Sequence, residues 1–211
     1  MNIEQAKTLR TFVRRRLGPQ PSMEGGTSPE EMMYLANIIA LTDARHIAEI
    51  GLNAGYSAHA MLSERLDVRV VSFDIGSHTY INTAKLLLDD MYKDRHKLII
   101  GNSMESVPDF CYSYPTTKFD MAFIDGGHSY KTAIADIVNM RNICKKGAFI
   151  IMDDVTPFRN YGRGPFKAWN DAIQEGVVEH VEFIQDGERV ISPDPAGTHV
   201  WAAGVYKMRG K

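Results

Sequence analysis

Acidic side chains follow two apolar segments of the sequence that we expect to be strands. Asp125 comes directly after residues 119–124, and Asp153 and Asp154 come directly after residues 148–152. The carboxyl ends of parallel strands meet at one edge of a sheet, so these three carboxylates are expected to converge there. Left bare, they would repel one another and raise at least one pKa, a conflict that a hard divalent cation such as Mg²⁺ removes. The pattern therefore favours a metal site, with a pair of turn aspartates as the alternative.

A histidine stands beside this group of acids. His128 lies three residues beyond Asp125, after the turn Gly126-Gly127. An imidazole can accept a proton near neutral pH, which makes His128 a candidate general base. An ordinary surface or core histidine is the competing interpretation.

A glycine-rich turn follows the first expected strand, residues 46–50. Gly51 and Gly55 let the backbone turn sharply and approach a ligand, and the helix that follows offers free N–H groups. Asn53 stands where the dinucleotide-binding pattern has its second glycine, which disfavours NAD. Asp74 follows the second strand, where an acidic side chain can accept the ribose hydroxyls of an adenosine moiety. A turn or cap role is the alternative for Asp74.

The turn after the third expected strand offers two more polar residues. Asn102 and Ser103 follow residues 97–100. At this edge of the sheet they would border an adenine ring. In the alternative interpretation, Ser103 is only the cap of the next helix.

These residues need a sheet that brings several strand ends together. Short apolar segments alternate with helical ones, which predicts right-handed crossovers and a mostly parallel sheet with helices on both faces. The last two strands have no helix between them, which predicts an antiparallel hairpin at the sheet edge. The fold class is therefore α/β and doubly wound. The seven expected strands span residues 46–50, 68–73, 97–100, 119–124, 148–152, 181–185 and 200–208.

A long loop is expected to leave the fifth strand beside the acids. It spans residues 155–165, before a helix over residues 166–174, and aromatic residues continue to Trp169. Arg159 and Arg163 could hold an anionic acceptor such as a carboxylate or a phosphate. A surface loop with its aromatic side chains packed on the sheet is the alternative.

The amino-terminal segment is typical of an amphipathic helix over residues 3–17. Arg14, Arg15 and Arg16 end this helix. Cations suit the carboxyl end of a helix dipole, so we favour a solvated helix end over a phosphate or nucleic-acid contact. A loop rich in glycine and proline follows from Gly18 to Thr27.

Length and composition limit the class of protein. The 211 residues carry a formal net charge of −2, which does not suggest a general polyanion binder. Two cysteines, no signal-peptide pattern and no apolar run long enough to span a membrane predict a cytoplasmic protein. We expect residues 1–211 to form one domain, with residues 1–27 as a cap in which residues 23–27 close the cofactor cleft.

Together the motifs resemble the class I S-adenosylmethionine-dependent methyltransferases, with their Rossmann-like sheet. More closely, the chain is similar to the metal-dependent small-molecule O-methyltransferases. I-A-E-I-G-L-N-A-G-Y-S, residues 47–57, resembles their first motif. F-I-D-G-G-H-S-Y, residues 123–130, is similar to a signature of the branch that includes sugar and antibiotic-tailoring enzymes.

The resemblance implies a role for each candidate residue. It assigns the metal to Asp125, Asp153 and Asp154, and proton transfer to His128. Catechol-type relatives commonly carry Asn where Asp154 stands and Lys where His128 stands. The implied cofactor-binding residues are Glu49, Gly51, Asn53, Gly55, Tyr56, Ser57, Asp74, Asn102, Ser103 and Asp125.

The resulting hypothesis is an S-adenosylmethionine-dependent, Mg-dependent O-methyltransferase acting on a small hydroxylated acceptor. Vicinal diols, sugars and catechol-like molecules are the expected acceptors, and Mn²⁺ and Ca²⁺ stay open as the metal. One alternative is a methyltransferase-like module that binds the cofactor without turnover. Another is a nucleic-acid methyltransferase, which the absence of an N-P-P-Y type motif disfavours. We expect no membrane partner, and a homo-oligomer is left open.

Overall fold

The computed structural model describes residues 1–18 and 26–207. The chain divides into two compact units, Met1–Gly101 and Asn102–Lys211, and each is described by itself. Residues 19–25 of the expected cap, including residues 23–25 of the segment expected to close the cofactor cleft, lie outside the described residues.

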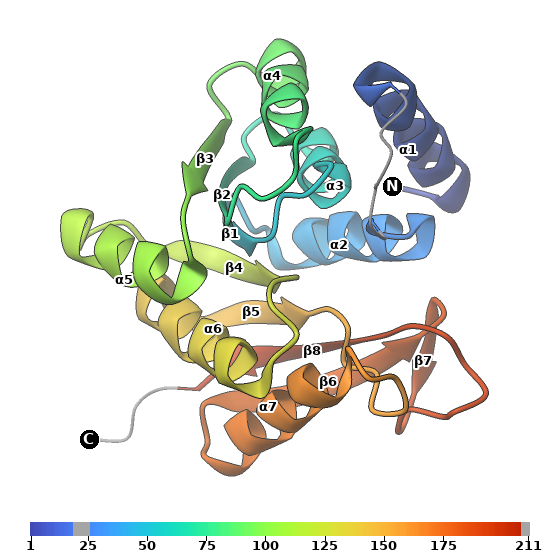
Figure 1. Cartoon of the computed structure of the whole chain (residues 1–211), viewed down its shortest axis with the longest axis vertical. Coiled ribbons are helices and arrows are strands. Elements are labelled where there is room, and N and C mark those ends of the chain that lie inside the picture. Colours follow the sequence, from blue (N-terminus) through green and yellow to red (C-terminus); the bar gives the residue numbers. More distant parts are fainter. Residues whose placement is uncertain (19–25, 208–211) are drawn as a thin grey trace. The chain divides into compact units, whose positions relative to one another are not determined.

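The first unit contains a parallel three-stranded sheet. Strand β1 pairs with β2 and β2 pairs with β3, all in parallel, in the order β3-β2-β1. Ile50 lies opposite Phe73, and Asp74 lies opposite Ile100, so the carboxyl ends of the three strands meet at one edge. The elements are α1 (Ile3–Leu17), α2 (Pro29–Thr42), β1 (His46–Ile50), α3 (Tyr56–Glu64), β2 (Arg69–Asp74), α4 (Ile81–Tyr92) and β3 (His96–Ile100) (Figure 1).

Helix α1 packs on the other helices of this unit through its apolar face. Asn2 caps the helix, accepting a hydrogen bond from the N–H of Gln5, whose side chain accepts one in return. Val13 and Leu17 are buried in a cluster that also contains Tyr56 of α3. The predicted amphipathic helix is confirmed, and its core holds the first turn of α3 in place.

The second unit contains a mixed sheet in the order β4-β5-β8-β6-β7. Strands β4 and β5 are parallel, whereas β8 runs antiparallel to both β5 and β6. Helix α6 contacts both α5 and α7. The elements are α5 (Ser103–Ser113), β4 (Phe119–Ile124), α6 (Tyr130–Ile143), β5 (Cys144–Met152), α7 (Arg163–Gln174), β6 (Val178–Gln185), β7 (Glu188–Val190) and β8 (Val200–Tyr206).

The antiparallel pairing of the last two predicted strands is confirmed by β6 and β8. The predicted number of strands was one too low. Strand β7 has only three residues and pairs with β6 across the turn at Asp186 and Gly187, so the described residues contain eight strands rather than seven. So short a polar strand carries no hydrophobic pattern for a sequence analysis to detect.

The loop after β5 is shorter than predicted. Helix α7 begins at Arg163 instead of residue 166. Proline is tolerated in the first turn of a helix because its missing N–H has no partner there, so Pro165 is the third residue of α7 rather than the residue before it. Trp169 is fully buried and its Nε1 donates to Nδ1 of His180 at 3.2 Å. Trp169 is therefore a core residue and not part of a loop.

The structure bears on the cysteines and on membrane-spanning segments. Cys111 and Cys144 are both free, and Cys144 is buried. Within residues 1–18 and 26–207, no helix has the length and apolar character to cross a membrane.

Candidate functional site

The glycine turn of the first unit has the backbone conformation that its glycines predict. Gly51 and Gly55 have φ of 88° and 80°, a region that favours glycine. Asn53, between them, is also left-handed at 48°, which asparagine tolerates better than most residues. The N–H of Gly51 donates to the carbonyl of Phe73 at 2.8 Å, which fastens the turn to β2. The turn is thus held directly at the end of the sheet.

Asp74 ties this turn to the end of β2. One of its carboxylate oxygens accepts hydrogen bonds from the N–H groups of Leu52 and Asn53, at 2.8 and 3.0 Å. The other accepts from the N–H of Gly76 at 2.7 Å. The turn role of Asp74 is therefore confirmed. A carboxylate has about four acceptor positions, so capacity for a ribose hydroxyl is left, and that binding role stays a prediction.

Glu49 belongs to a buried polar network that crosses the three strands. Its carboxylate accepts hydrogen bonds from the hydroxyls of Ser57, at 2.5 Å, and Ser72. The Ser72 hydroxyl also lies 2.9 Å from Nε2 of His96. Burial raises the pKa of Glu49 to about 7, against the lowering effect of the two hydroxyls. Burial lowers the pKa of His96 to about 4. Glu49 thus forms hydrogen bonds that link β1 to β2 and to α3 inside the unit.

Asn102 and Ser103 lie at the beginning of α5. The alternative interpretation made Ser103 the cap of this helix, but Asn102 is the N-cap residue, and its side chain accepts from the N–H of Met104 at 3.1 Å. Ser103 is the first residue of the helix. Asparagine and serine cap helices about equally well, so the sequence could not decide between neighbours.

Two of the three predicted acids of the second unit, Asp125 and Asp154, lie together at the ends of β4 and β5, whereas Asp153 is not grouped with them. The N–H of Asp153 donates to the carbonyl of Ile124 at 2.9 Å, so the ends of β4 and β5 adjoin. Asp125, His128 and Asp154 each offer a possible ligand atom, and these atoms lie within 4.8 Å of one another. His128 Nε2 is 2.8 Å from Asp154 Oδ2. Two carboxylates and an imidazole therefore form one cluster.

Asp153 faces a residue that the sequence analysis missed. Its Oδ1 lies 2.6 Å from Nε2 of His199, which is 3.9 Å from Asp154 Oδ1. Burial alone would lower the pKa of His199, but the charge and hydrogen bond of Asp153, with the charges of Asp154 and Asp186, raise it to about 9. The two residues are 46 positions apart, and no motif or periodicity in the sequence predicted their contact.

Backbone packing fixes the loop that carries His128. Ser129 caps α6 by accepting from the N–H of Thr132 at 3.1 Å. A Cβ added at Gly164 of α7 would lie 2.2 Å from the carbonyl oxygen of His128, so only glycine allows this approach. The His128 ring is 5.8 Å from that of Tyr161, and its side chain is 48% exposed. His128 is thus both anchored and accessible.

Comparison with known proteins identifies the family. A family described as "Methyltransferase domain" matches residues 48–155, just over half of the chain. The chain belongs to this methyltransferase family. The match begins within β1 and ends just after Asp154, so it includes the glycine turn, Asp74 and the Asp125–His128 loop. Among curated proteins, none matches the sequence.

Solved structures of methyltransferases share the fold. An O-methyltransferase from Bacillus cereus in complex with SAH superposes with a TM-score of 0.69 at 19% identity, covering 97% of this chain and all of that one (100%). The O-methyltransferase TomG from Streptomyces achromogenes, in complex with SAM, gives 0.69 at 18% identity, covering 98% and 89%. A SAH-bound methyltransferase from Podospora anserina gives 0.70 at 16% identity, covering 98% and 87%. The predicted fold class, a parallel α/β core with antiparallel carboxyl-terminal strands, is confirmed.

Proposed function

We propose that this methyltransferase transfers the methyl group of S-adenosylmethionine to a hydroxyl oxygen of a small acceptor, with a divalent cation, favoured as Mg²⁺, in the site. The observation that carries the proposal is the cluster of Asp125, His128 and Asp154 in a chain of the methyltransferase family. Oxygen and nitrogen ligands at the ends of β4 and β5 suit the binding and deprotonation of a hydroxyl group.

The first unit supplies the residues proposed for the cofactor. The turn from Gly51 to Gly55 presents backbone close to the amino end of α3, where free N–H groups suit the carboxylate of the methionine moiety. Asp74 holds that turn and has capacity left for a ribose hydroxyl. The buried hydrogen bond from the hydroxyl of Ser57 to the carboxylate of Glu49 joins the residues on either side of this turn and so stabilises it. In the second unit, Asn102 and Ser103 are proposed to border the adenine, as the sequence resemblance implies, and Asp125 to contribute to cofactor binding.

The acidic cluster of the second unit fits a divalent cation. Asp125, Asp153 and Asp154 remain the proposed ligands, and His128 lies with two of these carboxylates, beside the position where a cation would bind. When bound, the cation would lower the pKa of an acceptor hydroxyl and the cofactor would supply an electrophilic methyl group. Cations with a preference for oxygen suit the three carboxylates.

The protein's own residues perform the proton transfer. His128 would accept the proton of the acceptor hydroxyl while the cofactor supplies the methyl group to its oxygen. Asp154, 2.8 Å from Nε2, orients that ring. His199 holds Asp153 and balances part of the negative charge. Gly164 and Ser129 fix the loop, so the base is preorganised rather than recruited.

The same geometry favours one alternative, a methyltransferase that needs no metal. His128 and His199 each pair with a carboxylate, so the cluster is partly neutralised by protein groups alone. Under this alternative, the imidazoles position the acceptor directly. Removal of metal with a chelator distinguishes the metal-dependent from the metal-independent enzyme, because only the metal-dependent enzyme would lose methyltransferase activity.

The test is methyl transfer from labelled S-adenosylmethionine to a panel that begins with catechols and vicinal diols. We expect activity with magnesium, loss of activity with chelator, and restoration by added magnesium. Asp125→Asn should behave like the chelated enzyme. Asp120→Asn is the matched control, because Asp120 lies at the other end of β4 and pairs with Lys145. Activity that survives chelation favours the metal-independent alternative. Tight cofactor binding without methylation of any acceptor would favour the non-catalytic module.

A further inference from the structure

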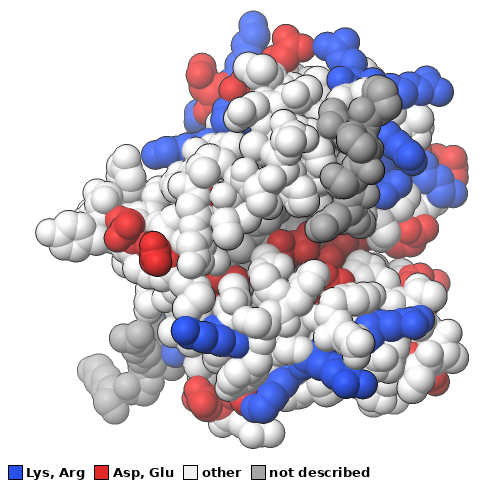
Figure 2. Space-filling view, in the orientation of Figure 1, with Lys and Arg blue, Asp and Glu red and all other residues white. Residues whose placement is uncertain are grey.

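Helix α1 carries a stripe of cations directly beside its buried face, which is formed by Ala6, Val13 and Leu17. Lys7, Arg10 and Arg14 recur at spacings of three and four residues, which places them along one side of a helix. Figure 2 shows Lys and Arg side chains gathered over α1. Like charges at this spacing repel one another, so their alignment costs stability unless an anion lies among them.

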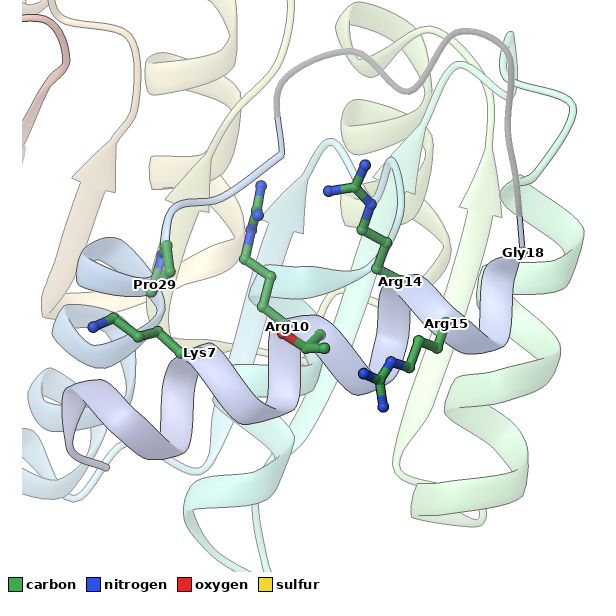
Figure 3. A pocket seen from close by; sticks show the side chains of 7 residues that line it. Lys7, Arg10, Arg14, Arg15, Gly18 and Pro29 are labelled. Carbon is green, nitrogen blue, oxygen red and sulfur yellow. The ribbon is translucent and has the colours of Figure 1, made fainter.

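A pocket of about 570 Å³ lies along this stripe. Its size is within the range of small-molecule sites. Figure 3 shows Arg10 and Arg14 extending from the same side of α1, with Lys7 one turn earlier and Arg15 leaving from an adjoining side. None of the described residues that line the pocket is acidic. The pocket therefore presents concentrated positive charge.

Two of the pocket cations have described partners, whereas two do not. Lys7 pairs with Glu4 on the same helix at 3.0 Å. Arg10 donates to the carbonyl of Thr27 at 3.0 Å and lies over the ring of Tyr56, which holds its guanidinium in place. Arg14 and Arg15 form no ion pair with any acid in residues 1–18 and 26–207. Arg16, next in sequence, pairs with Asp90 at 3.8 Å and does not line the pocket.

Arg10 packs over the ring of a buried tyrosine, Tyr56. Tyr56 is 2% exposed, and its hydroxyl has no hydrogen-bond partner among the residues that the structure describes. Burial raises the pKa of Tyr56, and the charges of Arg10 and Arg14 act against that rise. Tyr56 does not line the pocket, so it serves to hold Arg10 and is not itself a ligand-binding residue.

We propose that the α1 pocket, lined by Lys7, Arg10, Arg14 and Arg15, binds a small molecule through a diphosphate or similarly charged group. Several cations around one concavity suit an anion with more than one charge, since each phosphate oxygen can accept a charge-assisted hydrogen bond. A pocket of limited volume fits a small molecule better than an extended polyanion, and the net charge of −2 gives the whole chain no general attraction for polyanions.

The test is calorimetric titration of sodium pyrophosphate into the full-length, metal-free protein in magnesium-free buffer of low ionic strength. Omission of metal keeps the acidic cluster from binding a metal–pyrophosphate complex. We expect saturable binding at one site, at least tenfold tighter than binding of sulfate. Arg14→Gln should weaken pyrophosphate binding about tenfold, the loss typical of one charge-assisted hydrogen bond.

Arg16→Gln is the matched control, because it removes the same charge from the same helix outside the pocket. It should change the dissociation constant less than twofold. Equal losses in Arg14→Gln and Arg16→Gln, or equal affinity for sulfate and pyrophosphate, would overturn the proposal in favour of diffuse attraction. Circular dichroism checks folding, and Arg15→Gln gives a second, independent variant of the pocket.

Two further probes separate the proposed ligand from larger polyanions. A 20-nucleotide single-stranded RNA and vesicles of anionic phospholipid are titrated under the same conditions. Tighter, Arg14-dependent binding of either one than of pyrophosphate would replace the small-molecule site by a macromolecular surface. No cofactor or acceptor enters these titrations, so their outcome is independent of the proposed methyl transfer.

Discussion

Replacement of Glu49 by Gln should make the protein more stable at alkaline pH. Glu49 is fully buried, and its folded-state pKa is raised from 4.5 to about 7. The folded protein therefore holds the carboxyl proton more tightly than the unfolded chain does. The stabilising contribution is fully present below pH 4.5 and is lost as the pH rises to about 7.

The magnitude follows from the two pKa values. Between pH 5 and pH 8, the linkage relation gives the wild type a loss of about 2.5 kcal/mol in unfolding free energy from this one group. A glutamine cannot ionise, and its amide can donate to Ser72 and accept from Ser57, so the network stays paired. The stability of Glu49→Gln relative to wild type should therefore rise by about 2.5 kcal/mol over this interval.

Urea unfolding of both proteins at pH 5, 6, 7 and 8 measures this difference. In thermal unfolding it corresponds to roughly 5–10 °C for a chain of this length. Glu188→Gln is the matched control, because Glu188 is exposed at the start of β7 and should leave the pH profile unchanged. Parallel profiles for wild type and Glu49→Gln would refute the reasoning, because they would mean that Glu49 ionises in the folded protein as it does in water.

Three further substitutions test the rest of the structure. His128→Ala should lower turnover about 100-fold or more while the affinity for S-adenosylhomocysteine, measured by calorimetry, changes less than twofold; a large loss of affinity would make His128 structural. Gly164→Ala should lower the unfolding free energy by about 2 kcal/mol, although alanine favours helices, because its Cβ would meet the carbonyl of His128. Unchanged stability in urea unfolding would show that α7 can shift. Asp74→Asn should cost about 1–3 kcal/mol in the same assay and weaken cofactor binding, since three N–H groups lose a charged acceptor. A stable variant that binds the cofactor normally would contradict the role of Asp74.

Local patterns predicted the parallel strands and the residues after them. The helix and strand periodicities located β1 to β5, and the position of Asp125 and Asp154 directly after β4 and β5 brought them together as expected. These inferences succeeded because the residue directly after a parallel strand lies at the edge of the sheet where the carboxyl ends of the strands meet. The amphipathic pattern of α1 was sufficient for the same reason.

Long-range pairings could not be predicted in this way. His199 reaches Asp153 only because β8 lies beside β5, and no spacing in the sequence encodes that neighbour. The network from Glu49 through Ser72 to His96 depends on the register of three strands. Pro165 was misread as the end of a loop because the same residue suits a loop and the first turn of a helix.

Calorimetric titration of S-adenosylhomocysteine into the purified protein tests the central claim most directly, with magnesium in one buffer and chelator in the other. We predict saturable one-site binding with a micromolar dissociation constant in both buffers, since the proposed cofactor residues around the glycine turn need no metal. Absence of binding in both buffers, from protein shown by circular dichroism to be folded, would contradict the proposed use of S-adenosylmethionine.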